Sequence, residues 1–317
     1  MISGDKLIYN IDNVINRKPI TADLFLTNYC NNRCKYCTYK RWGLSKNEQK
    51  YVTFEEFKRN VEILQGLGVK GYILTGGGEP CINPDFDKIT EWLETNDLKY
   101  GINTNFNVLK FIKPVYLKIS LDASCCEEYK DLRGVGTYDK VISNINQYIE
   151  WKENNNVSTK LGLQCVGITP EQIERFYKSV QNFKCDYIVI RPVESTMSTY
   201  YSDLQNEETR LKCVKLIEKL KQKDKRIVVN YKWYETKTIF RKCSANCTQI
   251  ALDENSKVIY CCHKPFEVVG DITDNDILQK KDNYETDISK CDVPCRLTAP
   301  NKIYNNITQK PCDYCFV

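Results

Sequence analysis

Three cysteines lie close together near the start of the chain, at Cys30, Cys34 and Cys37. Thiolate is the ligand that iron–sulfur clusters use, and four cysteines complete a cluster of four irons. Three thiolates on one short loop would hold three irons and leave the fourth open to another ligand. Zinc also takes cysteine ligands, so a zinc loop or chance spacing is the alternative from these residues alone. The spacing indicates a metal site with an open position, where chemistry can take place.

A second chemical element is the glycine-rich turn Thr-Gly-Gly-Gly-Glu-Pro, from Thr75 to Pro80. Glycine lets the backbone approach a ligand closely and exposes N–H and C=O groups to it. The carboxylate of Glu79 can accept hydrogen bonds from an ammonium group. A tight turn without a ligand is the plain structural alternative. The turn therefore suggests a place where an amine binds.

Alternating strand-like and helix-like segments must position these residues. Six apolar, strand-like runs occur at residues 23–26, 71–75, 100–104, 115–121, 160–166 and 187–190. Helix start signals fall between them: a capping box from Thr53 to Glu56, an N-cap followed by proline at Asn83, and the same arrangement at Thr169. Six βα units predict an α/β fold, a partial (β/α)6 TIM-like barrel with its helices outside. An open doubly wound sheet is the alternative.

Polar or reactive residues follow five of the six strand-like runs. The cysteine loop follows the first run and the glycine turn the second, and later runs end at Asn105, at Ser120 with Asp122, and at Arg191. In parallel βα folds the carboxyl ends of the strands meet at one face, and ligands bind there. We therefore expect these residues to converge at the mouth of the barrel. A Ser or Asp in such a place can also cap a helix.

The loop Cys30-Asn31-Asn32-Arg33-Cys34-Lys35-Tyr36-Cys37, taken with Gly77 to Pro80, resembles the signature of the radical SAM superfamily. The resemblance covers roughly residues 20–195. It implies that the three cysteines hold a 4Fe–4S cluster whose open iron binds S-adenosylmethionine (SAM). It also implies that a reductant such as flavodoxin or ferredoxin supplies an electron, that SAM is cleaved to a 5′-deoxyadenosyl radical, and that the radical removes a hydrogen atom from the substrate.

The same resemblance implies a set of residues that contact SAM or its cluster. They are Tyr36, Gly77, Gly78, Glu79, Pro80, Asn105, Ser120, Asp122, Arg133 and Arg191. A surface ion pair is the alternative for Arg133.

The alternation of strands and helices stops at the C-terminal end, where eight of the last 75 residues are cysteine. A helix-like segment at 207–223 and a strand-like run at 226–233 lead into this tail. Residues 248–260 alternate around Asp253-Glu254-Asn255-Ser256, which predicts a β-hairpin. We expect four regions: a lead-in (1–20), the barrel (21–195), a connector (196–238) and a cysteine-rich, metal-organised domain (239–317).

The tail is similar to the twitch/SPASM extension of many radical SAM enzymes, which implies one auxiliary 4Fe–4S cluster. The expected ligands are Cys243, Cys261, Cys291 and Cys295. Ser256 stands where that extension usually has glycine, and the later cysteines do not reproduce its seven-cysteine pattern, which argues against a second auxiliary cluster. A four-cysteine zinc site or no metal is the alternative. Cys312 and Cys315 are expected to bind another metal or simply to pack, and the roles of Cys247 and Cys262 stay open.

Three further thiols, Cys125, Cys126 and Cys165, lie near the predicted barrel mouth. A thiol there could donate a hydrogen atom to a substrate radical, as in some members of the superfamily. Free cysteine more often packs as a small apolar side chain, and that alternative applies to each of the three.

The composition restricts the class of protein. The 317 residues carry a net charge of +5 with acidic and basic residues interspersed, which argues against a nucleic-acid-binding face. The N-terminus lacks a secretory signal, and no apolar run approaches the ~18 residues of a membrane helix. A reducing, cytoplasmic location follows, in which 17 cysteines indicate metal or redox sites rather than disulfides. The single histidine, His263, nearly excludes chemistry that needs several histidines.

The combined prediction is a radical SAM oxidoreductase or transferase-like enzyme whose auxiliary cluster supports a net oxidation. Only about 20 residues precede the first strand, too few for the leader-binding domain that peptide-modifying relatives often carry. The expected substrate is therefore a small metabolite, such as a sugar or an amino acid derivative. The alternative substrate is a ribosomal peptide that the enzyme would cross-link or epimerise. A zinc-ribbon module that binds nucleic acid and a pure electron carrier are rivals from other classes.

Overall fold

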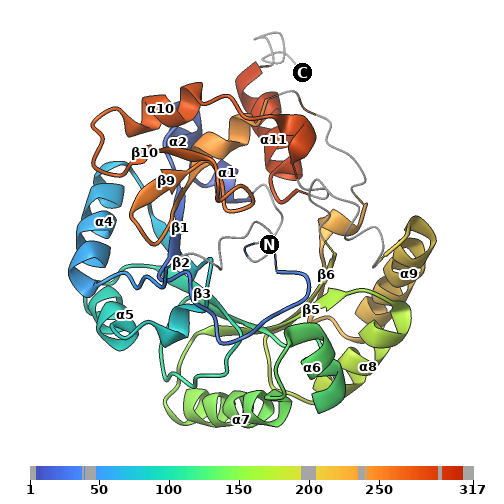
Figure 1. The fold of residues 1–317 in the computed structure, drawn as a ribbon. Coiled ribbons are helices and arrows are strands. Elements are labelled where there is room, and N and C mark those ends of the chain that lie inside the picture. The colour runs from blue at the N-terminus through green and yellow to red at the C-terminus, as the bar shows by residue number, and fades with distance from the viewer. Residues whose placement is uncertain are drawn as a thin grey trace.

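The protein forms one curved sheet of ten strands with helices packed on its outer face (Figure 1). The computed structural model describes residues 5–37, 39, 48–193, 205–234, 240, 242–291 and 295–309. The strands are β1 (Thr21–Phe25), β2 (Gly71–Thr75), β3 (Tyr100–Thr104), β4 (Tyr116–Ser120), β5 (Lys160–Gly167), β6 (Tyr187–Pro192), β7 (Ile227–Val229), β8 (Gln249–Leu252), β9 (Lys257–Ile259) and β10 (Val268–Asp271). The α-helices are α1 (Asp5–Ile8), α2 (Ile11–Ile15), α4 (Phe54–Gly66), α5 (Phe86–Thr95), α6 (Cys126–Arg133), α7 (Tyr138–Asn154), α8 (Pro170–Val180), α9 (Glu207–Lys223), α10 (Ile277–Asn283) and α11 (Thr298–Gln309).

Strands β1 to β7 are parallel neighbours in the order of the chain. The helices between them, from α4 to α9, lie around the outside of the curve (Figure 1). From β1 to β7 the strand order never reverses, which excludes the doubly wound alternative. Among the strands that the structure describes, β7 and β10 are the two edges of the sheet, so this part of the barrel is open rather than closed. The predicted partial TIM-like barrel is confirmed.

The side chains of each strand alternate between the helices and the barrel interior. On β2 and β4, Leu74, Leu117 and Ile119 are fully buried in the core under the helices. Their neighbours on the other face, such as Thr75 and Ser120, are half-buried. The sheet therefore separates an apolar outer layer from a more accessible interior.

Two glycines make room for aromatic rings on the inner face. Gly101 on β3 pairs with Tyr116 on β4, and Gly162 on β5 pairs with Tyr187 on β6. A Cβ atom on either glycine would lie 2.1 Å from the facing ring. An alanine at either position would displace the ring, because real Cβ atoms do not approach other atoms so closely.

Two of the predicted helix starts are confirmed. The side chain of Thr53 accepts from the amide of Glu56 while the Glu56 carboxylate accepts from the Thr53 amide, which is a complete capping box before α4. The side chain of Thr169 accepts from the amide of Gln172 at the start of α8.

The helix start predicted at Asn83 is wrong by two residues. Helix α5 begins at Phe86, and Asp85 is its N-cap residue. The side-chain amide of Asn83 donates instead to the carbonyl oxygens of Leu26 (2.8 Å) and Val52 (2.9 Å). Asn83 thus joins the chain after β1 to the entry of α4, and its side-chain oxygen accepts from the amide of Asp85 (2.8 Å) in the turn that precedes α5.

The connector is a helix followed by a short strand. Helix α9 has the predicted bounds, Glu207–Lys223. The strand predicted to run to Trp233 is wrong beyond Val229, because residues Tyr231–Tyr234 form a 3₁₀ turn, η3. The indole N–H of Trp233 donates to the carbonyl oxygen of Ile190 on β6 at 2.8 Å. This bond draws the chain back across β6 and ends β7.

The predicted tail hairpin is present, and it continues the barrel sheet. Strands β8 and β9 pair antiparallel, while β8 pairs parallel with β1. In the turn, Ser256 has a φ of 61°, the left-handed region that favours glycine. The side-chain amide of Asn60, on α4, donates to the Ser256 hydroxyl at 2.8 Å. The hairpin is therefore attached to the barrel by backbone pairing and by this side-chain bond.

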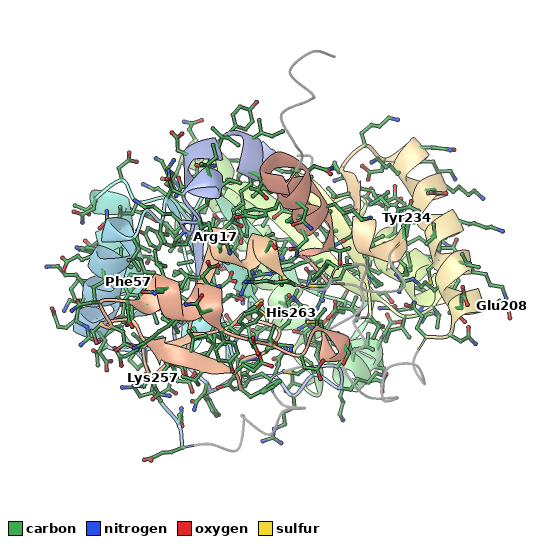
Figure 2. All side chains as sticks on the ribbon, turned by 90° about the horizontal axis from the view of Figure 1, so that it is seen from above. Arg17, Phe57, Glu208, Tyr234, Lys257 and His263 are labelled. Carbon is green, nitrogen blue, oxygen red and sulfur yellow. The ribbon has the colours of Figure 1, made fainter. Side chains whose placement is uncertain are left out.

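The first helices of the chain pack against the last one. Apolar residues of α1 and α2 form one buried cluster with Ala245 and Tyr304 of the tail. Arg17, which Figure 2 labels, donates to the Tyr304 hydroxyl at 2.7 Å and pairs with the carboxylate of Asp282. The two ends of the described chain thus lie side by side. Across the ranges described, no helix has the length and apolarity needed to cross a membrane.

Candidate active site

The cysteine loop follows β1, and the glycine-rich turn fixes one side of it. The amide of Gly78 donates to the carbonyl oxygen of Thr27 at 2.9 Å, and the amide of Glu79 to that of Tyr29 at 2.8 Å. A Cβ atom on Gly78 would lie 1.8 Å from the same Tyr29 oxygen. Only glycine allows these two segments to approach so closely. The turn after β2 therefore fixes the backbone that leads into Cys30.

The carboxyl end of helix α6 fixes the other side of the loop. The amides of Arg33 and Lys35 donate to the carbonyl oxygens of Arg133 (2.9 Å) and Leu132 (3.1 Å). Such last-turn carbonyls have no partner within their own helix. Gly134 ends the helix with a φ of 74°, and a Cβ atom there would lie 2.7 Å from the Arg33 carbonyl oxygen. The loop is thus held between two elements of the barrel.

Three predicted site residues form one buried, hydrogen-bonded group next to the loop. Asp122 accepts from the Tyr36 hydroxyl, from the Arg133 guanidinium (2.5 Å) and from the amide of Val166 (2.7 Å). Burial, and then the Asp122 charge, raise the pKa of Tyr36, so the phenol stays protonated and donates. Arg133 also donates to the Cys34 sulfur at 3.3 Å. Asp122 anchors these side chains, and its own contact with a cofactor stays a prediction.

Glu79 is buried behind the glycine turn. One of its oxygens accepts from the Thr104 hydroxyl (2.5 Å) and the amide of Cys81 (3.2 Å), and the other accepts from the amide of Asn105 (2.7 Å). Burial raises the pKa of Glu79, and these hydrogen bonds oppose the rise. The Cys81 thiol is a further hydrogen-bonding neighbour of Glu79, so the structure itself occupies the roughly four acceptor positions of this carboxylate. In the structure Glu79 ties the turn to the end of β3.

Asn105 reaches from the end of β3 to the cysteine loop. Its amide nitrogen donates to the side-chain oxygen of Asn31 at 2.6 Å and lies 3.8 Å from the sulfur of Cys30. Ser120, at the end of β4, accepts from the side chain of Gln164 on β5 at 3.5 Å. Asn105 therefore contacts the loop directly, whereas Ser120 contacts the neighbouring strand.

A cavity of about 190 Å³ lies beside the loop. It is lined by Cys34, Tyr36, Cys37, Arg133, Val166, Arg191 and Val193. Two thiols thus face guanidinium groups that come from α6 and from β6. The Nε atom of Arg133 is buried and makes no hydrogen bond within the described part of the chain. These groups fit a thiolate-bound cluster with an anionic ligand beside it.

The loop cysteines are thiols in a partly buried setting. Burial, followed by the charge of Glu79, raises the pKa of Cys30 to about 12, and a bound metal would hold it as the thiolate. Among the residues that the structure describes, no three Cys, His, Asp or Glu side chains close around one point as the ligands of a single ion would. The thiolates of a four-iron cluster each bind a different iron, so they need not converge in that way.

The structure gathers the predicted auxiliary ligands around one aromatic ring. Cys243, Cys261 and Cys295 pack with Tyr260 in a small cluster of the tail, and Cys291 is an electrostatic neighbour of the same ring. Burial raises the pKa of Cys243 to about 11, so this group is a thiol until a metal binds. Their role as ligands stays a prediction.

The other tail cysteines have different surroundings. Cys262 packs with Cys37 and Tyr39, on the side of the barrel mouth. Cys247 hydrogen-bonds with the hydroxyl of Tyr304, on α11. Cys312 and Cys315 lie outside the described residues.

The three candidate hydrogen-atom donors do not line the cavity beside the cysteine loop. Cys125 is exposed at the start of α6, and the sulfur of Cys126 lies 3.6 Å from the carbonyl oxygen of Gly136. Cys165 is fully buried, and its thiol faces the carbonyl oxygen of Asp122 at 3.7 Å. Cys126 and Cys165 are thus packed, while the exposed Cys125 makes no side-chain capping hydrogen bond, and a donor role for any of the three stays a prediction.

Two contacts between the barrel and the tail were not predicted from the sequence. Arg296 reaches into the barrel and pairs with Asp23 on β1. The Tyr39 hydroxyl donates to Glu254 in the hairpin turn at 3.2 Å, and a Cβ atom on Gly77 would lie 2.4 Å from the Tyr39 ring. No local pattern marks such pairs, because their members are 273 and 215 residues apart in the chain.

Comparison with known proteins gives a family for most of the barrel. Residues 24–180 match the family described as the radical SAM superfamily. Among curated proteins, the chain is 32% identical over 147 residues to the GTP 3′,8-cyclase of Clostridium perfringens strain SM101. That alignment covers 43% of this chain and 43% of the cyclase, so the chain matches less than half the length of this relative.

Two solved structures resemble the fold over most of the chain. Streptococcus suis SuiB bound to the precursor peptide SuiA has a TM-score of 0.63 and 18% identity, covering 92% of this chain and 73% of SuiB. The structure described as native anSMEcpe with bound AdoMet and Cp18Cys peptide has a TM-score of 0.63 and 14% identity, covering 84% of this chain and 81% of the other. At these identities the likeness concerns the fold.

Proposed function

We propose, from the premise that this chain belongs to the radical SAM superfamily, that it cleaves SAM reductively and removes a hydrogen atom from a small polar metabolite. The observation that carries the proposal is the cavity shared by Cys34, Cys37, Arg133 and Arg191. When bound, a 4Fe–4S cluster together with SAM supplies a 5′-deoxyadenosyl radical there. A reductant such as flavodoxin or ferredoxin would provide the electron.

The chain's own residues would hold and orient the cofactor. The cysteine loop would bind three irons, in a position fixed by the glycine turn and by α6. Arg133, held by Asp122, would present its buried guanidinium to the carboxylate of SAM, and the glycine turn that Glu79 ties to β3 would lie beside the ammonium group. Val166 and Val193 would exclude water from one side of the cavity.

The inner face of the barrel favours a small polar substrate. Asp23, Asn103 and Tyr116 are neighbours there, and Arg296 joins them from the tail. The side-chain oxygen of Asn103 is buried and accepts no hydrogen bond within the described residues. It is therefore available to a hydroxyl or amine of a ligand. Sugars and amino acid derivatives carry such groups.

We also propose that the reaction is a net oxidation. The tail, residues 239–317, would hold an auxiliary 4Fe–4S cluster through Cys243, Cys261, Cys291 and Cys295, beyond the barrel (21–195) and the connector (196–238). That cluster would itself accept the electron that the substrate radical gives up. The substrate would lose one hydrogen atom to the adenosyl radical and then one electron and one proton, so that two electrons leave it in total.

A peptide substrate is the second candidate. It is favoured by the likeness of the fold to SuiB, solved with its precursor peptide, and to anSMEcpe, solved with a bound peptide. The relationship to a GTP 3′,8-cyclase favours a small molecule. The polar inner face agrees with the small molecule, and on that ground we place it first.

Anaerobic reconstitution tests the radical function. The native chain, the triple variant C30A/C34A/C37A and the control C185A, remote from the site, would be assayed for iron, zinc and formation of 5′-deoxyadenosine from SAM and dithionite. About eight irons, with 5′-deoxyadenosine lost only in the triple variant, would support the proposal. Zinc in place of iron, with no cleavage of SAM in the native chain, would contradict it.

The substrate class is tested by stimulation of the same reaction. The small-molecule and peptide fractions of a cell extract would be added separately, and the 5′-deoxyadenosine that depends on each fraction would be measured. Stimulation by the small-molecule fraction alone supports a metabolite. Stimulation by the peptide fraction alone makes the peptide candidate correct.

A further inference from the structure

A buried lysine lies next to the tail cysteines. Lys281, on α10, has 5% of its surface exposed, and its ammonium donates to the carbonyl oxygen of Asn246 at 2.8 Å. It also lies 5.6 Å from the centre of the Tyr260 ring. Within the described part of the chain it forms no ion pair with a carboxylate. The adjacent Asp282 is held by Arg17, whose Nε donates to it at 2.8 Å.

This arrangement is unusual for a lysine. Lysine side chains are almost never fully buried unless they are paired, because an ammonium loses its hydration on burial and needs an opposite charge in its place. The preceding residue shows the ordinary case: Lys280 is exposed and pairs with Asp274 and Asp276, each at 3.0 Å. One carbonyl and one aromatic ring compensate only part of a buried full charge.

The charged groups that could compensate Lys281 are sulfurs. Its electrostatic neighbours are Cys243, Cys261 and Cys247, with Asp282 contributing less. Neutral thiols bring no charge. Thiolates bound to a metal do, and two of these three cysteines are the predicted ligands of the auxiliary site. Cys243, Cys247 and Lys281 line one small cavity of about 20 Å³, which the paired Arg17 and Asp282 line as well, so these side chains border the same space.

We propose that Lys281 is the built-in counter-charge of the auxiliary site and raises the reduction potential of the cluster bound there. The inference rests on the proposed function, since it requires a thiolate-bound cluster in the tail. Net charge and hydrogen bonding around the sulfurs set the potential of an iron–sulfur cluster. A nearby cation stabilises the reduced, more negative state, so Lys281 makes the cluster a better electron acceptor. Lys281 thus acts on the cluster through its positive charge and does not bind a metal ion.

The test measures the midpoint reduction potential of the tail cluster and not the rate of turnover. In the C30A/C34A/C37A background only the tail can hold iron, so its cluster gives the only iron–sulfur signal. Three further variants would be made in this background: K281M, which keeps the length but removes the charge; K281R, which keeps the charge; and K280M, which removes the exposed neighbouring lysine. Iron content would be counted, and the midpoint potential would be followed by electron paramagnetic resonance during a redox titration.

We expect about four irons in each protein and a lower midpoint potential in K281M alone. An unchanged potential in K281M with its iron retained would overturn the inference and leave the proposed function intact. If K281M loses its iron, retention of iron by K281R supports the need for a charge, and loss from both variants shows a packing role and overturns the inference. Absence of iron from the parent background removes the auxiliary cluster itself, and the inference fails with it.

Discussion

The cysteine loop at the barrel mouth and the cysteine group of the tail balance charge in different ways. At the loop, Arg133 donates to Cys34 but is already paired with the buried carboxylate of Asp122 at 2.5 Å. At the tail, Lys281 lies among thiols and pairs with no carboxylate of the described chain. Arg133 is thus neutralised by a carboxylate, with Arg191 as a second cation lining the same cavity, whereas Lys281 is not neutralised. The difference predicts a lower potential for a cluster at the loop than for one at the tail.

The two sites also differ in construction. The loop is contiguous in sequence, and backbone hydrogen bonds hold it between the glycine turn and the end of α6. The tail thiols come from separate segments, and pairing of β8 with β9 and with β1 brings them near one another. The first site is thus fixed by the barrel, whereas the second depends on closure of the hairpin. A low-potential donor and a higher-potential acceptor in one chain are what a net oxidation by a radical enzyme requires.

The largest expected effect comes from the glycine turn. In Gly78→Ala the new Cβ atom would lie 1.8 Å from the Tyr29 carbonyl oxygen, so the backbone before Cys30 must move. A shift of about 1 Å at a site of chemistry can cost roughly 100-fold in rate. We expect at least that loss in formation of 5′-deoxyadenosine, with the tail iron retained. Gly66→Ala is the matched control, because nothing lies within 4 Å of a Cβ atom there. Equal activity of the two variants would show that the turn does not fix the loop.

The next effect concerns Asp122, the buried carboxylate beside the cysteine loop. Asp122→Asn leaves Arg133 buried without its counter-charge, and breaking a buried ion pair costs about 3–5 kcal/mol. The free energy of unfolding, measured in urea, should fall by this amount. Asp131→Asn is the control, since the Lys35–Asp131 pair is exposed and worth at most about 1 kcal/mol. A loss as small in Asp122→Asn as in the control would mean that the loop does not depend on a neutralised cation.

A smaller effect tests how the hairpin turn is joined to the loop. Burial, and then the charge of Asp253, raise the pKa of Glu254, which accepts from Tyr39. The folded state therefore holds the proton more tightly than the unfolded state. The stabilisation from this proton is complete below the unfolded pKa, near 4.5, and is lost as pH rises through the folded pKa.

Glu254→Gln removes this dependence on pH. Relative to the native chain, the variant should gain stability as the pH rises above about 4.5, as measured by the urea midpoint at each pH. Glu62→Gln, on the exposed face of α4, should show no such change. A difference between variant and native chain that does not vary with pH would mean that Glu254 ionises in the folded protein as it does in water.

Local patterns predicted those parts of the molecule whose physical cause is local. The capping box at Thr53 and the strand at Gly71–Thr75 depend on neighbouring residues and were placed correctly. The placing of Asn105 and Arg191 near the cysteine loop followed from the rule that parallel strands end at one face, whereas Arg133, on α6, was expected from the family resemblance. This rule needs only the order of strands and helices.

The features that the sequence did not predict depend on contacts between segments that are distant in the chain. Asn83 has an N-cap signature, yet the buried carbonyls of Leu26 and Val52 take its amide. The pairing of β8 with β1 leaves no mark in either strand, and nothing near Lys281 in the sequence distinguishes it from the exposed Lys280. Burial of a charge is decided by packing, and the sequence alone gives no packing.

The smallest expected effect concerns the turn of the tail hairpin, which holds serine where the related extensions usually have glycine. Ser256→Gly relieves a left-handed conformation that costs about 1–2 kcal/mol in other residues. It also removes the acceptor of the buried Asn60 amide, which costs about 1–3 kcal/mol. The two effects oppose each other, so the free energy of unfolding should change by less than about 1 kcal/mol. A double-mutant cycle with Asn60→Ala separates them, and the expected coupling is about 1 kcal/mol. A coupling near zero would mean that the serine conformation is maintained by the pairing of β8 with β1 alone, and that the link between Asn60 and Ser256 does not help to attach the hairpin.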